Sequence, residues 1–255
     1  MNKTTLRGGV LRRVLGAAIL TLASVSAAQA AVITFEGQTG PAYNGRSFQE
    51  DGYTVSFEAP GGTASPGSVL IGRFIDGSDP ATCAPSICPT NNPTTYFDLF
   101  NSGLIDIITA PTGSTFRFAS LDASFIATPG VTYPAIPAAL QIIGLRADQT
   151  TETIQFNIPD AIAFQTYDAA DADLLRSTID GATFAMTDFV EIAIIGFRCD
   201  DNFQCTGLDN GPGEIGVDNI ALSDLPPVNP VPEPATLSLM AFGLLGLGAR
   251  MRRRH

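Results

Sequence analysis

The sequence is poor in the side chains that most enzymes use as bases, nucleophiles or metal ligands. Tryptophan is absent, the only histidine is His255 and the only lysine is Lys3. Residues 31–230 contain neither histidine nor lysine, so a Ser-His-Asp triad, a Cys-His pair and a lysine Schiff base each lack a member there. Zinc is disfavoured too, because the cysteines do not follow Cys-x-x-Cys spacing. The lack of tryptophan removes the side chain most typical of sugar-stacking platforms.

Positive charge is equally scarce in residues 31–230. This stretch has six arginines against twenty-four acidic residues, a formal charge of −18. Such a body repels phosphate backbones, which excludes nucleic acid as a partner, and it attracts divalent cations. Carboxylate chemistry is the one catalytic route left, and a glycosidase with two carboxyl groups about 5 to 10 Å apart stays open. The sequence marks out no such pair.

The first thirty residues have the layout of a secretory signal peptide. An apolar stretch over residues 14–27 follows a basic leader, and Ala28 and Ala30 supply the small side chains of a cleavage site. We expect the Sec translocon to export the chain and signal peptidase to cut before Ala31. A first transmembrane helix is the alternative, which the short apolar stretch disfavours. The basic residues of the leader are Lys3, Arg7, Arg12 and Arg13.

Residues 231–255 divide into a proline-rich motif, an apolar run and a basic end. We expect a transmembrane helix over about 235–249 and a basic tail over 250–255. Arginines that flank an apolar helix stay on the cytoplasmic side, so the body must lie outside. The apolar run is shorter than the roughly 20 residues that span a bilayer, which suits a temporary anchor. The motif residues are Val231, Pro232, Glu233, Pro234, Ala235 and Thr236, and the stop residues are Arg250, Arg252, Arg253 and Arg254.

This three-part tail resembles the PEP-CTERM sorting signal of exported bacterial proteins. The resemblance implies processing by an exosortase, a transient anchor in the inner membrane of a Gram-negative-type bacterium, and delivery to the cell surface or extracellular matrix. Many such proteins are biofilm-matrix components of bacteria that make exopolysaccharide. An ordinary, permanent membrane anchor is the alternative. Because the resemblance covers only about the last tenth of the chain, it leaves open what the body does.

Residues 31–225 are expected to form one all-β domain, an antiparallel, jelly-roll-like β-sandwich, joined to the tail by a proline-rich linker over 226–230. Apolar and polar side chains alternate over residues 151–158, which predicts one buried and one wet face. Pairs such as Asp51-Gly52 and Asp180-Gly181 are typical of tight turns. Helical signal is limited to one or two turns within 168–179. The expected strands are 32–35, 53–57, 69–75, 95–100, 105–109, 115–118, 140–145, 153–158, 190–197 and 215–222.

The four cysteines form two close pairs in the sequence, Cys83 with Cys88 and Cys199 with Cys205. In an exported protein an even number of cysteines predicts disulfides, and four cysteines permit three connectivities. We favour the two local bridges, each of which would close a loop. Bridges across such short loops stabilise by on the order of 2 kcal/mol each.

Acidic side chains crowd the C-terminal part of the body, where Asp200, Asp201, Asp209, Glu214 and Asp218 fall within nineteen residues. Ca²⁺ takes six to eight oxygen ligands from carboxylates and carbonyls, so this density makes a calcium site a candidate. The spacing does not match an EF-hand. Acidic loops that are merely solvated are the alternative.

A second, weaker resemblance bears on the same residues. Residues 33–37 (Ile-Thr-Phe-Glu-Gly) and 216–222 (Gly-Val-Asp-Asn-Ile-Ala-Leu) resemble the first and last strands of jelly-roll, carbohydrate-binding-like modules. The resemblance implies that the terminal strands lie side by side and that acidic residues on them join a structural Ca²⁺ site. The candidate ligands are Glu36, Asp218, Asp200 and Asp201.

Together these features predict an exported, exosortase-processed protein of the surface or matrix, with a structural or glycan-binding role and extracellular polysaccharide as its candidate partner. No catalytic residue is assigned. A carboxylate-dependent glycosidase and a protein–protein scaffold of the cell surface are the alternatives.

Overall fold

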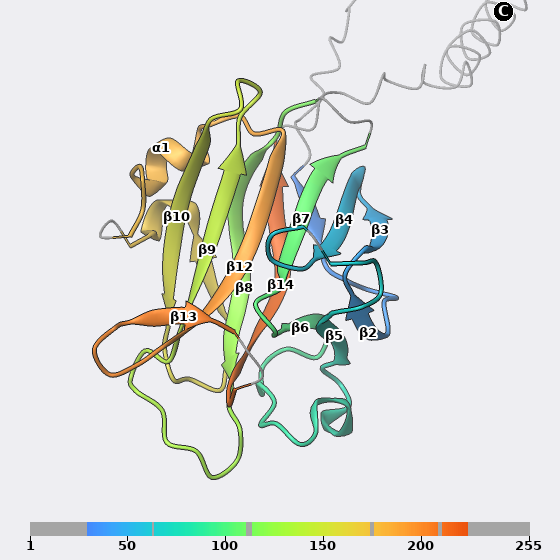
Figure 1. The fold of residues 1–255 in the computed structure, drawn as a ribbon, viewed down its shortest axis with the longest axis vertical. Coiled ribbons are helices and arrows are strands. Elements are labelled where there is room, and N and C mark those ends of the chain that lie inside the picture. The colour runs from blue at the N-terminus through green and yellow to red at the C-terminus, as the bar shows by residue number, and fades with distance from the viewer. Residues whose placement is uncertain (1–29, 63, 111–113, 174–175, 209–210, 224–255) are drawn as a thin grey trace, which may run out of the picture.

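A computed structural model describes residues 30–62, 64–110, 114–173, 176–208 and 211–223. Within these residues the chain forms two antiparallel sheets of seven strands each, packed face to face (Figure 1). Helical structure in the same residues is restricted to a short helix, α1 (Gly181–Ala185), and two 3-10 turns, Pro80–Cys83 and Ala169–Asp171. The predicted all-β antiparallel sandwich is therefore confirmed.

The first sheet, sheet A, has the strand order β11-β8-β14-β6-β5-β2, with β1 paired to β14 beside this path. The terminal strands pair antiparallel, with Val32 opposite Ala221, so the expected neighbourhood of the two ends of the domain is confirmed. Its strands are β1 (Ala31–Ile33), β2 (Gly40–Tyr43), β5 (Leu70–Asp76), β6 (Thr95–Leu99), β8 (Arg117–Ile126), β11 (Gln165–Asp168) and β14 (Glu214–Ser223).

The second sheet, sheet B, has the order β10-β9-β12-β7-β4-β3, with β13 paired to β12. The turn between β3 and β4 contains the predicted Asp51-Gly52 pair, and both residues have positive φ. Its strands are β3 (Arg46–Glu50), β4 (Tyr53–Glu58), β7 (Leu104–Thr109), β9 (Ala138–Leu145), β10 (Thr151–Ile158), β12 (Glu191–Cys199) and β13 (Cys205–Gly207).

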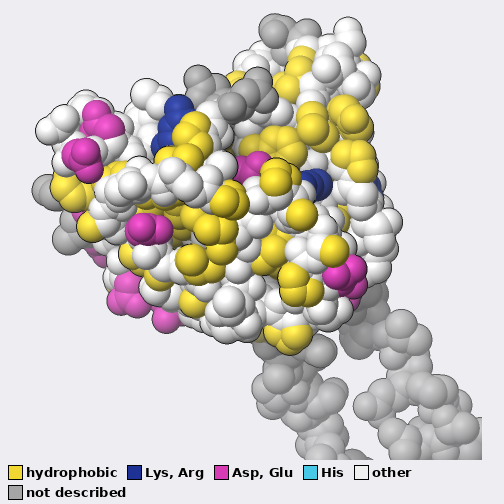
Figure 2. Space-filling model, turned by 90° about the horizontal axis from the view of Figure 1, so that it is seen from below, with side chains coloured by type: hydrophobic (Ala, Val, Ile, Leu, Met, Phe, Trp, Pro, Cys, Tyr) yellow, Lys and Arg dark blue, Asp and Glu magenta, His cyan; other side chains and the backbone are white. Residues whose placement is uncertain are grey.

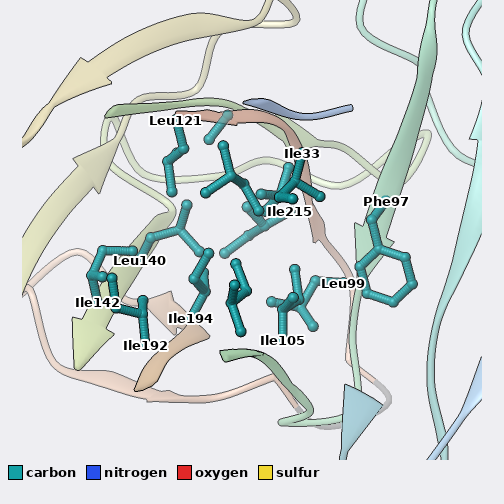
Figure 3. Close-up of a cluster of buried hydrophobic side chains, with 14 of the residues drawn as sticks. Ile33, Phe97, Leu99, Ile105, Leu121, Leu140, Ile142, Ile192, Ile194 and Ile215 are labelled. Atoms are coloured by element: carbon teal, nitrogen blue, oxygen red, sulfur yellow. The ribbon is translucent and has the colours of Figure 1, made fainter. Parts of the chain in front are cut away.

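The core lies between the sheets, where alternate side chains of facing strands meet (Figure 3). Sheet A contributes residues such as Leu121 and Ile215, and sheet B contributes Leu140 and Ile194. Because successive residues of a strand point to opposite faces, strands such as β4 and β7 bury every second side chain. In β10 this places the predicted apolar set in the core: Ile154, Phe156 and Ile158.

Most of the aromatic side chains are used to fill this core. Phe57 and Phe97 face each other across the sandwich with ring centroids 4.4 Å apart, and Phe35 and Phe74 pack against the same group. Aromatic pairs at such separations add to the free energy of burial. These rings are therefore covered by protein and are not exposed for contact with a ligand.

The helical turn expected within 168–179 is present as a 3-10 turn, whereas the helix α1 was not predicted. Within 168–179 the described residues form only the 3-10 turn Ala169–Asp171, and α1 begins later, at Gly181. The Asp180-Gly181 pair, expected to form a tight turn, starts this helix instead. The Asp180 carboxylate accepts the Thr183 amide at 2.9 Å, because Asp is also a favoured N-cap residue.

The described residues include no helix long and apolar enough to cross a membrane. The predicted signal peptide, the linker over 226–230, the sorting motif over 231–236, the helix over about 235–249 and the basic tail all lie outside the described residues.

Candidate functional site

An ion pair with a completely buried carboxyl group lies within sheet A. Asp98, in the middle of β6, is completely buried, and its Oδ2 accepts a hydrogen bond from Arg73 Nε at 2.9 Å. Arg73 and Asp98 lie directly opposite each other on the paired strands β5 and β6. A buried carboxylate without a cation would cost several kcal/mol, so the guanidinium opposite makes this position tolerable.

A second carboxyl group joins the pair from the start of β14. Glu214 Oε2 lies 3.5 Å from Arg73 Nη2 and accepts a hydrogen bond from Ser86 Oγ at 3.2 Å. The remaining oxygen of Asp98, Oδ1, is buried and has no hydrogen-bond partner among the described residues. We call Arg73, Ser86, Asp98 and Glu214 the Arg73 cluster.

The electrostatics of the Arg73 cluster follow from this arrangement. Burial, together with the neighbouring Glu214 carboxyl, raises the pKa of Asp98 well above its usual range, and Arg73 only partly offsets that rise. Tyr96 lies close by, and burial followed by the charge of Asp98 raises the pKa of its hydroxyl. The guanidinium of Arg73 therefore faces two carboxyl groups at once.

The Arg73 cluster also holds the loop closed by the first disulfide. Arg73 donates to the carbonyl oxygens of Cys83 at 3.2 Å and Ala84 at 3.4 Å. The Cys83–Cys88 bridge forms, and the Cys199–Cys205 bridge links β12 to β13, so the predicted local pairing is confirmed.

A cavity of about 220 Å³ opens beside Glu214. It lies where β5 and β14 begin and where β6 and β13 end, at the lower end of the sandwich in Figure 1. Figure 2, which looks at this end from below, shows apolar side chains gathered across its middle. We call this space the loop-end cavity; its lining residues are Leu70, Phe100, Asn101, Leu208, Gly211, Gly213 and Glu214.

Hydrogen bonds fix the walls of the loop-end cavity. Asn101 Nδ2 donates to the Leu70 carbonyl at 2.8 Å, and Ser102 Oγ donates to the Leu208 carbonyl at 2.8 Å. Gly213 has φ +95°, and an added Cβ would come within 2.6 Å of the Phe125 ring, so only glycine fits there. The cavity is thus built from positions whose backbones are held in place.

Two of the predicted calcium ligands meet the same segment of chain. The exposed Glu36 accepts the Thr95 amide at 3.0 Å, while the buried Asp218 accepts hydrogen bonds from Asn92 Nδ2 at 2.7 Å and Thr94 Oγ1 at 3.0 Å. The other Asp218 oxygen accepts the Asn219 amide at 2.8 Å. Burial raises the pKa of Asp218 to about 6 despite these donors.

The other two predicted ligands lie in a different part of the fold. Asp200 accepts the amides of Asn202 and Gln204 within the turn that joins β12 to β13 of sheet B, and Asp201 is exposed in that turn. In the part of the chain that the structure describes, no three His, Cys, Asp or Glu side chains are grouped so that they could hold a metal ion. Both Asp218 oxygens already have protein donors, and calcium binding at the terminal strands stays a prediction.

A second pair of neighbouring carboxyl groups lies on sheet B. Alternation places Asp106 on the face of β7 opposite to the buried Ile105 and Ile107. Burial, then the charge and hydrogen bond of Glu191, and then Glu58 raise the pKa of Asp106 to about 7. Around it this outer face has half-buried aliphatic side chains: Leu104, Ile108, Ile143, Ala193 and Ile195.

The sequence contained a signal for the Arg73 cluster that the spacing of motifs did not show. Asp98 interrupts the apolar run Tyr96-Phe97-Leu99, and Arg73 likewise interrupts Ile71 to Ile75. A charge inside a short apolar strand is unusual, because burying it requires a partner. Two such interruptions on consecutive strands would have indicated an ion pair.

Comparison with known proteins identifies the end of the chain. Residues 230–254 match the PEP-CTERM protein-sorting motif. The chain carries a PEP-CTERM sorting motif. Such a motif implies export, a transient membrane-anchored state and an exosortase as processing partner. The matched residues lie outside those that the structure describes.

The body of the chain has weaker likenesses. No curated protein matches the sequence. Among solved structures, a mutant of the family 29 carbohydrate-binding module CBM29-2 is 14% identical, with 77% of this chain and 86% of that chain covered and a TM-score of 0.32. The module TmCBM61, in complex with β-1,4-galactotriose, is 4% identical, with 68% and 88% covered and a TM-score of 0.33. At these values the likeness carries no argument about ligand or mechanism.

Proposed function

We propose that this PEP-CTERM protein is exported, processed by an exosortase and delivered to the cell surface or extracellular matrix of a Gram-negative-type bacterium. There its sandwich has a structural role and binds extracellular polysaccharide. The sorting motif over residues 230–254 is the observation that carries this proposal. The signal-peptide layout of residues 1–30 and two disulfides are typical of the same route, since disulfides persist in oxidising compartments.

The charge of the body limits which polysaccharide it binds. A formal charge of −18 over residues 31–230 repels polymers of uronic acids or sulfated sugars at moderate ionic strength. An uncharged exopolysaccharide is therefore the proposed partner.

Binding without hydrolysis is the proposed activity. Each of the two carboxyl pairs stands within one sheet, Asp98 with Glu214 on sheet A and Asp106 with Glu191 on sheet B, whereas a glycosidase needs its two carboxyl groups on opposite sides of a glycosidic bond. If the mature protein released new reducing ends from the producer's own polymer, the glycosidase alternative would replace this proposal.

The sorting part is tested by intact mass on protein from surface and medium fractions, in a native host and in a strain without exosortase. We expect loss of the leader up to Ala30 in both strains, and loss of residues after the Val231–Pro234 region only where the exosortase is present. An unchanged C-terminus through His255 in both strains would mean a permanent anchor. The binding part is tested by affinity electrophoresis in gels containing the producer's exopolysaccharide, where retarded migration is expected.

A scaffold role is the second candidate, and the outer face of sheet B favours it. Half-buried aliphatic side chains such as Leu104 and Ile195 surround the Asp106–Glu191 pair there. Apolar surface of this kind is typical of protein contacts. Self-association in light scattering, or retention of other surface proteins, with no retardation by polysaccharide would favour the scaffold.

A further inference from the structure

The loop-end cavity has the size and the chemistry of a small ligand site. Its volume of about 220 Å³ is below the roughly 300 Å³ at which pockets for drug-sized molecules begin. A ligand that fills it is therefore small, or is one unit of a longer chain. The cavity lies at the end of the sandwich, where β5 and β14 begin and β6 and β13 end.

The polar side chain of the cavity that can accept hydrogen bonds from a ligand is Glu214. Asn101 shapes the wall, because its Nδ2 holds the Leu70 carbonyl and its Oδ1 is buried out of reach of solvent. Glu214 accepts from Ser86 and lies near Arg73, which leaves acceptor capacity on a carboxylate that has about four lone-pair sites. Hydroxyl groups are suitable donors for it.

The remaining walls are apolar. Leu70, Phe100 and Leu208 line the cavity, and Leu208 is only 3% exposed. A pyranose ring presents hydroxyl groups at its edge and C–H groups on its faces, so acceptors beside aliphatic and aromatic walls match it on both counts.

The charges around the cavity disfavour an ionic ligand of either sign. Glu214 and the acidic body repel a carboxylate or sulfate. Arg73 lies 3.5 Å from Glu214, and Arg198 lies so close to Gly211 that an added Cβ would overlap its guanidinium, so an ammonium group meets cations on two sides. An uncharged ligand avoids both penalties.

We propose that the loop-end cavity is the glycan subsite of this protein and holds one uncharged pyranose unit, with Glu214 accepting hydrogen bonds from its hydroxyl groups and Asn101 shaping the wall beside it. This rests on the proposed polysaccharide binding. Because hydrogen bonds already hold Leu70, Asn101 and Leu208 in place, little ordering is needed when the sugar binds.

The test is a titration of ¹⁵N-labelled protein, residues 31–223, with methyl glycosides of glucose, galactose and mannose, and separately with glucuronic and galacturonic acid. We expect at least one neutral sugar to shift the amide signals of Asn101, Leu208 and Gly213, and the uronic acids to shift them much less. Shifts that gather on Leu104 and Ile195 of sheet B instead would overturn the subsite while leaving polysaccharide binding in place.

Two variants, each of which removes one negative charge, sharpen the test. Glu214→Gln keeps the shape but removes the charged acceptor, so we expect the dissociation constant for the neutral sugar to rise about tenfold. Asp201→Asn removes a charge from an exposed turn and should leave it unchanged. Circular dichroism shows whether the Glu214→Gln protein is folded, and the wild-type titration gives the reference affinity. Equal affinities in a folded Glu214→Gln protein would overturn the role of Glu214.

The failures of the two proposals can be told apart. Retardation by the polymer with no shift at the cavity contradicts the subsite alone. Absence of retardation, together with no shift from any sugar, contradicts both. Shifts at the cavity without retardation support the subsite and restrict the partner to a different polymer from the one tested.

Discussion

The carboxyl pair of sheet A and the carboxyl pair of sheet B carry the same groups in different surroundings. Asp98 and Glu214 have Arg73 within hydrogen-bond or ion-pair distance, and Asp98 is completely buried. Asp106 and Glu191 lie on an outer face, and the neighbour that next affects Asp106 is another acid, Glu58. Sheet A therefore places a cation beside its pair, whereas the pair of sheet B has a third acid as its next charged neighbour.

Asp218 shows a third way to hold a buried carboxylate. Its oxygens accept hydrogen bonds from the amide and hydroxyl groups of Asn92, Thr94 and Asn219, with no cation in the set. Hydrogen bonds favour the charged form, yet burial outweighs them and still raises the pKa to about 6. In this acidic body, which has neither lysine nor histidine, buried carboxyl groups have a raised pKa or accept hydrogen bonds from amide and hydroxyl groups.

The largest effect is expected from removing the cation of sheet A. Arg73→Met leaves two carboxyl groups without a guanidinium, and breaking a buried ion pair costs about 3–5 kcal/mol. Urea unfolding at pH 7.5 measures the loss. Arg117→Met is the matched control, because the Arg117–Asp188 pair is exposed and such pairs contribute at most about 1 kcal/mol. Similar losses in both variants would contradict the special role of Arg73.

The raised pKa of Asp98 predicts a slope in the pH profile of stability. The pKa of Asp98 is raised in the folded state, so the folded protein binds more protons than the unfolded chain. Stability is then fully present at low pH and falls as pH rises above the usual Asp range toward the raised value. Asp98→Asn removes this titration and should flatten the profile. A slope identical to that of the wild type would show that Asp98 holds no extra proton.

A smaller effect is expected on sheet B. The pKa of Asp106 rises from 3.8 to about 7, so the wild type loses stability as pH increases from about 4 to about 7. Asp106→Asn should be the more stable protein at pH 8, by on the order of 1 kcal/mol once solvent screening is allowed for, and no more stable at pH 4. Thermal unfolding at both pH values measures this. Asp201→Asn, with its exposed side chain, serves as the control.

The smallest effect is expected from calcium, which stays a prediction. If Ca²⁺ binds at the terminal strands, millimolar Ca²⁺ should raise the melting temperature by about 2 °C, and Asp218→Asn should abolish the rise. Asp201→Asn should keep it, because the structure places Asp201 in the turn between β12 and β13. If Asp201→Asn abolishes the rise in melting temperature, the ion binds in that turn. If the wild type shows no rise, calcium binding is contradicted.

Local sequence patterns predicted much of the fold. Alternation in β10 and the Asp51-Gly52 turn were read correctly because both depend on neighbouring residues alone. The short strands β2, β3, β11 and β13 were missed, since their polar composition gives little periodic signal. The helix α1 was missed because Asp-Gly serves a turn and an N-cap equally well, and only packing decides between them.

The candidate site was far less predictable. The disulfides followed from close spacing in the chain, but Ser86 and Glu214 are 128 residues apart and nothing local connects them. The acidic residues within 200–218 were expected to share one site. Instead, Glu214 forms an ion pair with Arg73, Asp218 accepts a hydrogen bond from Asn92, and Asp200 accepts an amide of its own turn. Nearness in the sequence was a poor guide because the strands carry these residues into different sheets.

The sequence by itself determined the sorting motif, the acidity of the body, the lack of histidine and lysine, and the alternation that makes two-faced strands. Each of these is a property of composition or of adjacent residues. Only the tertiary structure decided which carboxyl group meets Arg73, which acceptors face the loop-end cavity and where Asp218 finds its donors. Those contacts depend on strand order and register, which arise when two sheets bury their apolar faces together and bring distant residues within hydrogen-bond distance.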